Sequence, residues 1–347
     1  MDKEFLITKT DEELREIFSS LGEKPFRADQ LRKWMYSLAE IGDMTNFSAA
    51  LREKLSEKYE TGYPKIMETF ISKDGTRKYL LKLFDGSIVE AVLMRYSYGN
   101  TLCISTQVGC PMACRFCASG LNGLERQMYS LELVTQVLLI NKELGGDRAI
   151  TNIVLMGTGE PFLNYDNVVA FLREIHKQDA LGISYRNISL STCGIRDNIL
   201  RFADEDIPLT LCLSLHSAIN EKRRSIMPVE ERIPLQDAVR AMEHYQKKTG
   251  RRIVYEYIMI GGLNIGDEDI DALYRLVKGQ TAHINLIPLN GNVGNFREPT
   301  KNEIKYFYDR LKDLGLSVTI RRSLGQDIEG ACGQLRARFL KDETGRA

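Results

Sequence analysis

Three cysteines, Cys110, Cys114 and Cys117, stand in a C-x3-C-x2-C spacing in this 347-residue sequence. A loop of this length can place three thiolates around one face of a metal cluster. A structural zinc site takes four ligands, usually as two C-x2-4-C pairs, and the next cysteine here is Cys193. The alternative is three small buried residues, but three of the seven cysteines fall within eight positions. The spacing therefore favours a four-iron cluster with one iron open to a further ligand.

Composition limits the classes of protein that the sequence can encode. The chain is long enough for one large domain and a small one. Because 47 basic residues balance 47 acidic ones, net charge neither indicates nor excludes nucleic acid. There is no signal peptide and no membrane-spanning apolar run. Seven cysteines without a secretory signal are typical of thiols in a reducing compartment. We expect a cytoplasmic protein with no membrane contact.

The period of the apolar residues divides the chain into three parts. Residues 1–60 repeat at three and four and predict a small helical accessory domain. Residues 61–96 repeat at two, with a turn at Asp85-Gly86, and predict a short β-strand extension. In residues 97–347, strand-like and helix-like runs alternate, which predicts parallel strand pairing. The predicted strands are 101–106, 150–156, 187–192, 209–216, 253–260, 284–289 and 317–321, and the helices are 131–144, 167–176, 235–248, 268–278 and 301–314.

Six or seven such units fall short of the eight of a closed TIM barrel. The fold class expected is therefore α/β, a partial (β/α)6 barrel preceded by the helical domain and the β extension. Active sites of such folds lie at the C-terminal ends of the strands. The cysteine loop follows the first predicted strand at that end, where a catalytic cluster should lie.

A cysteine triad that opens a βα barrel resembles the radical S-adenosylmethionine (SAM) enzymes. In that superfamily the amino and carboxylate groups of SAM bind the fourth iron of a [4Fe-4S] cluster. The segment Met156–Pro161 follows the second predicted strand and matches the glycine–glutamate segment that receives the SAM amino group. Glycines permit close backbone approach, and a carboxylate pairs with an ammonium. Alone, the segment could be an ordinary βα turn; with the triad it indicates a SAM site.

Further motifs resemble the RlmN/Cfr family of radical SAM RNA methyltransferases over nearly the whole chain. They are Gln107–Cys110, Cys117–Gly120, Gly159–Pro161, Ser214–His216, Asn285–Asn290 and Ala331–Leu335. The resemblance implies that Cys110, Cys114 and Cys117 bind one [4Fe-4S] cluster. It also implies that SAM is contacted by Gly159, Glu160, Ser191, Ser214, Leu215, His216 and Asn290. Cys193 stands where the family commonly has Ser or Thr, and we expect a small packed residue there.

The resemblance also implies how a methyl group is transferred. Carbon 2 of adenine is electron-poor and does not attack SAM as an amine would. Cys332 takes the methyl group from one SAM, and a second SAM, cleaved at the cluster, supplies a 5′-deoxyadenosyl radical. Glu90 accepts the proton from carbon 2, and Cys103 resolves the adduct by forming a disulfide with Cys332. From the residues alone, Cys332 is a lone thiol, Cys103 a buried strand residue, and Glu90 an outward-facing strand carboxylate.

The activity expected is methylation of adenine carbon 2 in 23S rRNA and in tRNAs by a monomer that receives electrons from a flavodoxin or ferredoxin. Three alternatives stay open. One is Cfr-like methylation of adenine carbon 8 in 23S rRNA, which shares these motifs although overall similarity favours carbon 2. Another is a radical SAM reaction on a small molecule, against which the pair Cys103 and Cys332 argues. The third is a non-enzymatic iron–sulfur or zinc protein that binds RNA.

Basic segments are the expected RNA contacts, together with the helical domain. Such runs are usually solvated faces, and alone they are weak indicators. The segments are Lys222–Arg224, Lys247–Lys248 with Arg251–Arg252, and Arg321–Arg322 with Arg336, Arg338 and Lys341.

Overall fold

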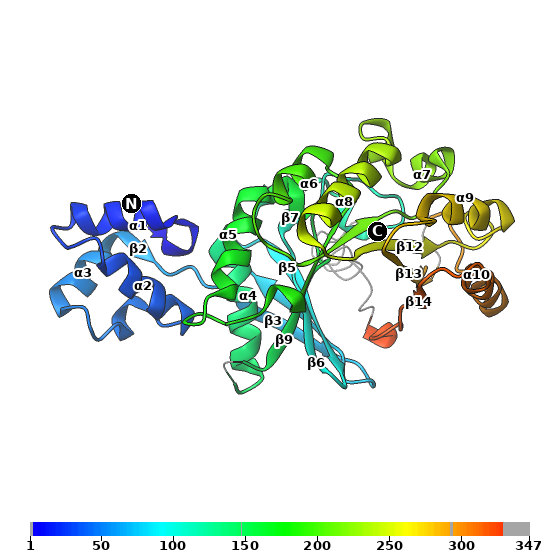
Figure 1. Cartoon of the computed structure of the whole chain (residues 1–347). Helices are drawn as coiled ribbons and strands as arrows, with labels where there is room; N and C mark the ends of the chain where they lie inside the picture. Colours follow the sequence, from blue (N-terminus) through cyan, green and yellow to red (C-terminus); the bar gives the residue numbers. More distant parts are fainter. Residues whose placement is uncertain (1–2, 147, 292–293, 329–347) are drawn as a thin grey trace.

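The computed structural model describes residues 3–146, 148–291 and 294–328. Cys332, Arg336, Arg338 and Lys341 lie outside the described residues. A helical unit lies at one end of the molecule, beside a long twisted sheet with helices along it (Figure 1). Within the described residues, no helix has both the length and the apolar character needed to cross a membrane.

The N-terminal unit contains α1 (Asp11–Ser20), α2 (Arg27–Tyr36) and α3 (Ala49–Lys58), with 3-10 turns η1 (Leu6–Thr8) and η2 (Ile41–Asp43). Helix α1 begins at a capping box, in which Thr10 accepts from the Glu13 N–H and the Glu13 side chain accepts from the Thr10 N–H. Strands β1 (Glu4–Phe5) and β2 (Tyr59–Glu60) pair in parallel and join the two ends of the unit. Its apolar core is separate from that of the sheet, although Leu131 of the first sheet helix packs into it. The prediction of a small helical domain is confirmed.

One sheet runs through the rest of the described chain, in the order β14-β13-β12-β11-β10-β9-β6-β5-β4-β3. Within this sheet the neighbours among β6, β9, β10, β11, β12, β13 and β14 pair in parallel. The neighbours among β3, β4, β5 and β6 pair antiparallel. The strands are β3 (Lys65–Ile71), β4 (Arg77–Lys82), β5 (Ile88–Tyr96), β6 (Gly99–Cys103), β9 (Ile150–Leu155), β10 (Ile188–Thr192), β11 (Thr210–Ser214), β12 (Ile253–Met259), β13 (Ala282–Pro288) and β14 (Val318–Ile320).

Helices connect the parallel strands, as strand–helix alternation predicts. They are α4 (Ser130–Glu143), α5 (Tyr165–His176), α6 (Arg196–Phe202), α7 (Asn220–Ile226), α8 (Leu235–Thr249), α9 (Asp267–Val277) and α10 (Lys301–Asp313). Short 3-10 turns complete the connections: η3 (Ala118–Gly120), η4 (Pro161–Asn164), η5 (Tyr185–Asn187), η6 (Pro228–Glu231) and η7 (Gln326–Ile328). The partial (β/α)6 barrel is confirmed, while the short helices α6 and α7 were not predicted because they span only about two turns each.

The β extension is continuous with the barrel sheet. Strands β3, β4 and β5 are not a separate layer, because β5 pairs with β6 and β6 pairs with β9. The first barrel strand is also shorter than the predicted run and ends at Cys103. After it, the N–H groups of Thr106 and Gln107 donate to the Thr158 carbonyl. The domain boundaries at residues 60 and 96 remain predictions.

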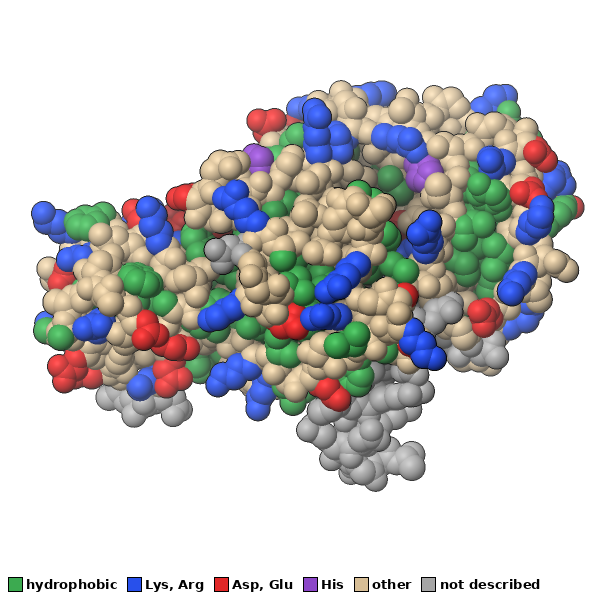
Figure 2. All heavy atoms as spheres, turned by 90° about the horizontal axis from the view of Figure 1, so that it is seen from below, with side chains coloured by type: hydrophobic (Ala, Val, Ile, Leu, Met, Phe, Trp, Pro, Cys, Tyr) green, Lys and Arg blue, Asp and Glu red, His purple; other side chains and the backbone are tan. Residues whose placement is uncertain are grey.

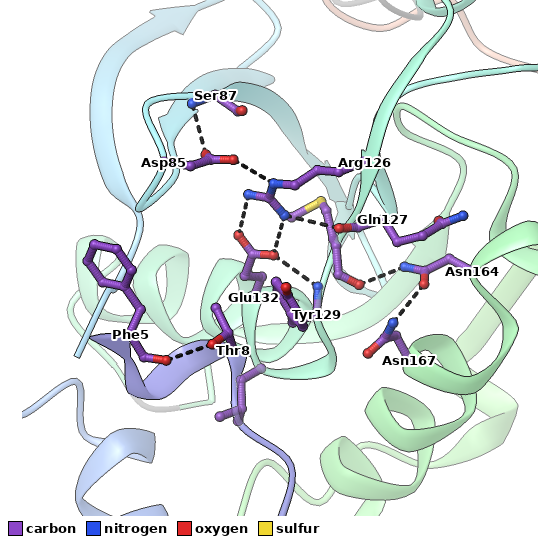
Figure 3. Close-up of polar contacts among 12 residues, drawn as sticks. Phe5, Thr8, Asp85, Ser87, Arg126, Gln127, Tyr129, Glu132, Asn164 and Asn167 are labelled. Carbon is purple, nitrogen blue, oxygen red and sulfur yellow. Dashed lines mark hydrogen bonds and ion pairs between the residues drawn. The ribbon is translucent and has the colours of Figure 1, made fainter. Parts of the chain in front are cut away.

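Arg126 connects the β4–β5 turn to the start of α4 (Figure 3). Its guanidinium donates to the Glu132 carboxylate at 2.8 and 2.9 Å and to Asp85 at 2.6 Å. It lies 4.8 Å from the centre of the Phe84 ring, which packs against Phe5. A bidentate pair of this kind fixes orientation as well as adding stability. The hairpin strand that carries Arg126 is therefore tied to the rest of the protein on three sides.

The burial of Arg223 contradicts the prediction for one residue of the basic segment Lys222–Arg224, which was expected to contact RNA. Its side chain is fully buried. The guanidinium forms an ion pair with Glu230 and donates to the carbonyls of Leu215 at 3.1 Å and Cys193 at 2.9 Å. A buried charge needs such partners, because its desolvation is costly. Arg223 thus holds the loops that follow β10 and β11, and it is not available to RNA.

We predict that Arg223→Met lowers the free energy of unfolding by about 3–5 kcal/mol, because Glu230 becomes a buried charge without its partner. Arg224→Met is the matched control, since Arg224 is the adjacent residue and is exposed. Urea denaturation measures both. Equal stability of the two variants would contradict the role assigned to the buried pair.

Candidate functional site

The cysteine loop lies between two short antiparallel strands, β7 (Gln107–Gly109) and β8 (Leu124–Gln127). Gly109 has φ +77°, and a Cβ there would lie 2.1 Å from the Gly123 carbonyl oxygen, so a larger residue does not fit. The Cys110 N–H donates to the same carbonyl at 2.9 Å. Ala113, inside the loop, has φ +51°. Backbone contacts therefore curl the loop before any metal is considered.

The three cysteines of the loop line one cavity of about 1140 Å³. Burial raises the pKa of Cys110 and of Cys114 to about 12, and repulsion from Cys117 and Glu160 acts in the same direction. Thiolates in this setting need a positive group beside them, which bound metal supplies. The loop also packs on an apolar cluster that excludes water. This donor set therefore fits an iron–sulfur cluster.

The arrangement of the possible metal ligands suits a cluster better than a single metal ion. Within the described part of the chain, no group of three or more His, Cys, Asp or Glu side chains is placed to hold one metal ion. The ligands of a single ion must converge on that ion. In a four-iron cluster each thiolate binds a different iron, so three cysteines around one cavity remain suited to it.

Glu160 is a buried carboxylate in the wall of the same cavity. One of its oxygens accepts from the Phe162 N–H at 3.1 Å and the other from the Cys193 N–H at 2.8 Å. Burial raises the pKa of Glu160, and these bonds to the charged form oppose the shift. The ion pairs found among the described residues do not include Glu160. A ligand with an ammonium group, such as SAM, would supply the opposite charge.

Two glycines beside Glu160 have a packing role that the sequence did not indicate. A Cβ on Gly157 would lie 2.5 Å from the Ile104 carbonyl oxygen, and one on Gly159, with φ +112°, would lie 2.7 Å from the Gln107 Cβ. Gln107 in turn accepts from the Glu160 N–H at 2.7 Å. The glycines therefore let the Glu160 turn pack against the chain that leads to the cysteine loop. Both also line the cavity.

Ser191, Ser214, His216 and Asn290 line the cavity at or just after the C-terminal ends of β10, β11 and β13. His216 is held by the Ile258 N–H, which donates to its Nδ1 at 3.0 Å. Burial, and then repulsion from a neighbouring arginine, lowers the pKa of His216 to about 3, so the ring is neutral. These positions agree with the predicted SAM contacts, which remain predictions.

Leu215 is the exception among the predicted SAM residues. Its side chain is fully buried in the sheet core and does not line the cavity. Its N–H donates to the Glu256 carbonyl, and its own carbonyl accepts from Arg223. Cys193 is buried as expected, and burial followed by Glu160 raises its pKa well above the usual value.

Glu256 is a cavity residue that the sequence did not reveal. It lies on β12, is buried, and accepts a short hydrogen bond from the Ser191 hydroxyl. That hydroxyl lies 3.2 Å from the Ser214 hydroxyl. This group of oxygens can bind a hydroxylated or cationic ligand. The sequence shows Glu256 only as a carboxylate inside an apolar strand, and such a residue more often faces solvent.

Glu90 and Cys103 line an adjoining cavity of about 840 Å³. They come from β5 and β6, whose register pairs Val92 with Cys103. The two cavities share walls made by Met156, Gly157, Ile287, Pro288, Asn290 and Arg321. The cavity of the cysteine loop and the cavity of Glu90 and Cys103 therefore lie next to each other. Cys332, the predicted methyl carrier, lies outside the described residues.

Comparisons with known proteins cover nearly the whole chain. Residues 6–61 match the ribosomal RNA large subunit methyltransferase N-terminal domain, and residues 104–277 match the radical SAM superfamily. The chain is 45% identical over 338 residues to a probable dual-specificity RNA methyltransferase RlmN of Clostridium perfringens, covering 96% of this chain and 97% of the relative. It is 46% identical over 339 residues to the RlmN of Lachnoclostridium phytofermentans, covering 96% and 94%.

A solved structure agrees with these relatives. The crystal structure of a radical SAM methyltransferase from Sphaerobacter thermophilus superimposes with a TM-score of 0.87 at 37% identity, covering 96% of this chain and 99% of that one.

We predict that Glu160→Gln weakens SAM binding roughly 10- to 150-fold, because it removes a charge-assisted contact. The amide also leaves one of the two backbone N–H groups without an acceptor. Equilibrium binding of SAM to the cluster-loaded protein measures the loss. Glu125→Gln is the matched control, an exposed carboxylate on β8. Unchanged affinity in Glu160→Gln, with iron content equal to the control, would contradict the assignment.

Proposed function

Because the chain belongs to the RlmN family of radical SAM RNA methyltransferases, we propose that it methylates carbon 2 of a specific adenine in 23S rRNA and in tRNAs. The observation that carries this proposal is the pair of adjoining cavities. One holds the three cysteines and Glu160, and the other holds Glu90 and Cys103. Such a division suits a reaction that generates a radical in one place and modifies a base in the next.

Cys110, Cys114 and Cys117 would hold one [4Fe-4S] cluster, and Glu160 the ammonium of SAM. When bound, the cluster and SAM supply the one-electron chemistry, by way of a 5′-deoxyadenosyl radical, that activates a methyl group. The protein supplies position and a dry cavity. Cys332 carries the methyl group, so that two SAM molecules serve each turnover, one as methyl donor and one as radical source.

Glu90 and Cys103 act after the Cys332 methylene carbon is joined to the adenine. A carboxylate oxygen of Glu90 accepts the proton from carbon 2. The one electron that the radical adduct must lose to restore the aromatic ring would return to the cluster. The Cys103 thiolate then attacks the Cys332 sulfur, and the sulfur–carbon bond breaks. Its electron pair leaves with the carbon, which takes up a proton and becomes the new methyl group. The product is a Cys103–Cys332 disulfide, which a two-electron reductant restores to thiols. We propose a flavodoxin or ferredoxin as the source of the single electrons that the cluster would need.

We predict that Cys103→Ala traps RNA on the protein, since nothing then attacks the Cys332 sulfur. A denaturing gel of the reaction shows the adduct, and mass spectrometry of nucleosides from the wild-type reaction shows 2-methyladenosine. Cys212→Ala is the matched control, because Cys212 is a buried β11 cysteine that lines neither cavity. Normal release of methylated RNA by Cys103→Ala would overturn the resolving role, and 8-methyladenosine would overturn the position of methylation.

RNA would approach the cavity that contains Glu90. Arg321 and Arg322 line it. The nearby β5–β6 turn carries Tyr96 and Tyr98, whose rings stack at 4.9 Å, and Tyr98 is 67% exposed. On the face shown in Figure 2, Lys and Arg side chains border a central hydrophobic surface. Unstacked RNA bases bind aromatic faces, and phosphates bind arginines. The target base must leave its stack to enter such a cavity.

We predict that Arg321→Gln with Arg322→Gln lowers RNA affinity and reduces the slope of log K against log salt by about 1 to 2 units. Binding is measured by filter retention of a substrate hairpin at several salt concentrations. Lys305→Gln with Arg310→Gln, exposed on α10, is the control with the same charge change. A slope equal to that of the control would exclude these arginines from the phosphate contacts.

A further inference from the structure

Strand β4 carries a buried lysine next to Glu90. Lys78 is 1% exposed and Glu90 is 5% exposed. The Lys78 Nζ lies 3.2 Å from a Glu90 carboxylate oxygen. The register pairs Lys78 with Val92 and Leu80 with Glu90, which places Lys78 and Glu90 diagonally on one face of the sheet. Val92 and Glu90 both line the cavity, so the ion pair lies at its wall.

Packing alone does not explain a lysine at this position. Its neighbours Tyr79, Leu80 and Leu81 are fully buried. An ammonium in such surroundings loses its hydration, and the attraction of a paired carboxylate roughly offsets that loss at best. An apolar side chain of similar size opposite a glutamine would fill the same volume without this cost. The pair therefore points to a need for a charged Glu90.

Other groups also face Glu90, from each element packed against it. Cys103 comes from β6, and Arg321 and Arg322 come from the segment after β14. The Ser105 hydroxyl donates to the Glu90 backbone carbonyl at 2.7 Å, which fixes the backbone but not the carboxylate. Lys78 contacts the carboxylate itself at ion-pair distance. It also belongs to a strand that is paired on both sides, whereas the arginines follow the last strand of the sheet.

We propose that Lys78 is a positioning residue that holds the Glu90 carboxylate aimed into the cavity, ready to accept the carbon 2 proton. This rests on the proposed function of Glu90. In that step the carbon–hydrogen bond of the RNA adduct breaks, the proton passes to a Glu90 oxygen, and the bond's electron pair stays in the ring. The unpaired electron of the adduct would return to the cluster. A buried carboxylate without a cation holds its own proton to higher pH. Losing Lys78 removes this neighbouring positive charge, so the protonated form of the carboxyl group is favoured more than in the wild type.

The test follows RNA–protein adduct and methylated product against pH in Lys78→Met. Near neutral pH the variant is expected to accumulate adduct that the wild type resolves. The acid limb of its rate profile should move to higher pH by about 1 to 3 units, the effect of a lost neighbouring charge. Lys82→Met is the matched control, an exposed lysine on the same strand. Glu90→Gln should accumulate adduct at every pH.

The outcomes separate this proposal from the proposed function. If Glu90→Gln accumulates adduct while Lys78→Met keeps the wild-type dependence of rate on pH, the role of Lys78 is overturned and that of Glu90 stands. No adduct in either variant would overturn the role of Glu90 as well. Lys78→Gln, which keeps a hydrogen-bond donor but no charge, is made alongside and should show the same shift. If both Lys78 variants lose the cluster and SAM cleavage, Lys78 serves the fold alone and the proposal fails.

Discussion

A buried carboxylate, Glu160, determines how the parts of the site face one another. Its side chain and its backbone N–H bind three segments at once: the chain before the cysteine loop through Gln107, its own turn through Phe162, and the loop after β10 through Cys193. The bonds are short and directed, and the low dielectric of the interior strengthens them. Because the carboxylate is an anion in a dry wall, the cavity favours a cationic ligand next to the cysteines.

Buried ion pairs recur around the site, and each one restrains an element that borders it. Arg223 with Glu230 holds the loops after β10 and β11. Arg126 with Glu132 holds the hairpin that follows the cysteine loop. Lys78 with Glu90 lies in the wall of the second cavity. Buried pairs add little stability compared with apolar packing. Their position beside the cavities is better understood as control of geometry and charge where chemistry occurs.

The antiparallel strands make the second cavity and also reach the end of the described chain. The Asp327 carboxylate accepts from the Ser72 hydroxyl at 2.5 Å and from the Lys73 N–H at 3.1 Å. The Gly325 N–H donates to Asp74 at 2.8 Å. The β3–β4 turn therefore anchors the segment that leads toward Cys332 in the sequence. Since β5 in the same sheet carries Glu90, the extension also contributes to the lining of the second cavity.

The sequence by itself determined the order of strands and helices, the cysteine triad and the segment of Glu160, because these depend on local period and spacing. It could not show which charges are buried. Arg223 looked like part of a basic surface, Glu256 like a solvent-facing strand residue, and Lys78 like one lysine among many. Each depends on a partner or a cavity wall from a distant element, and strand register and order decide which residues meet. Only the tertiary structure brings those partners together, so only it shows where a charge is kept from water.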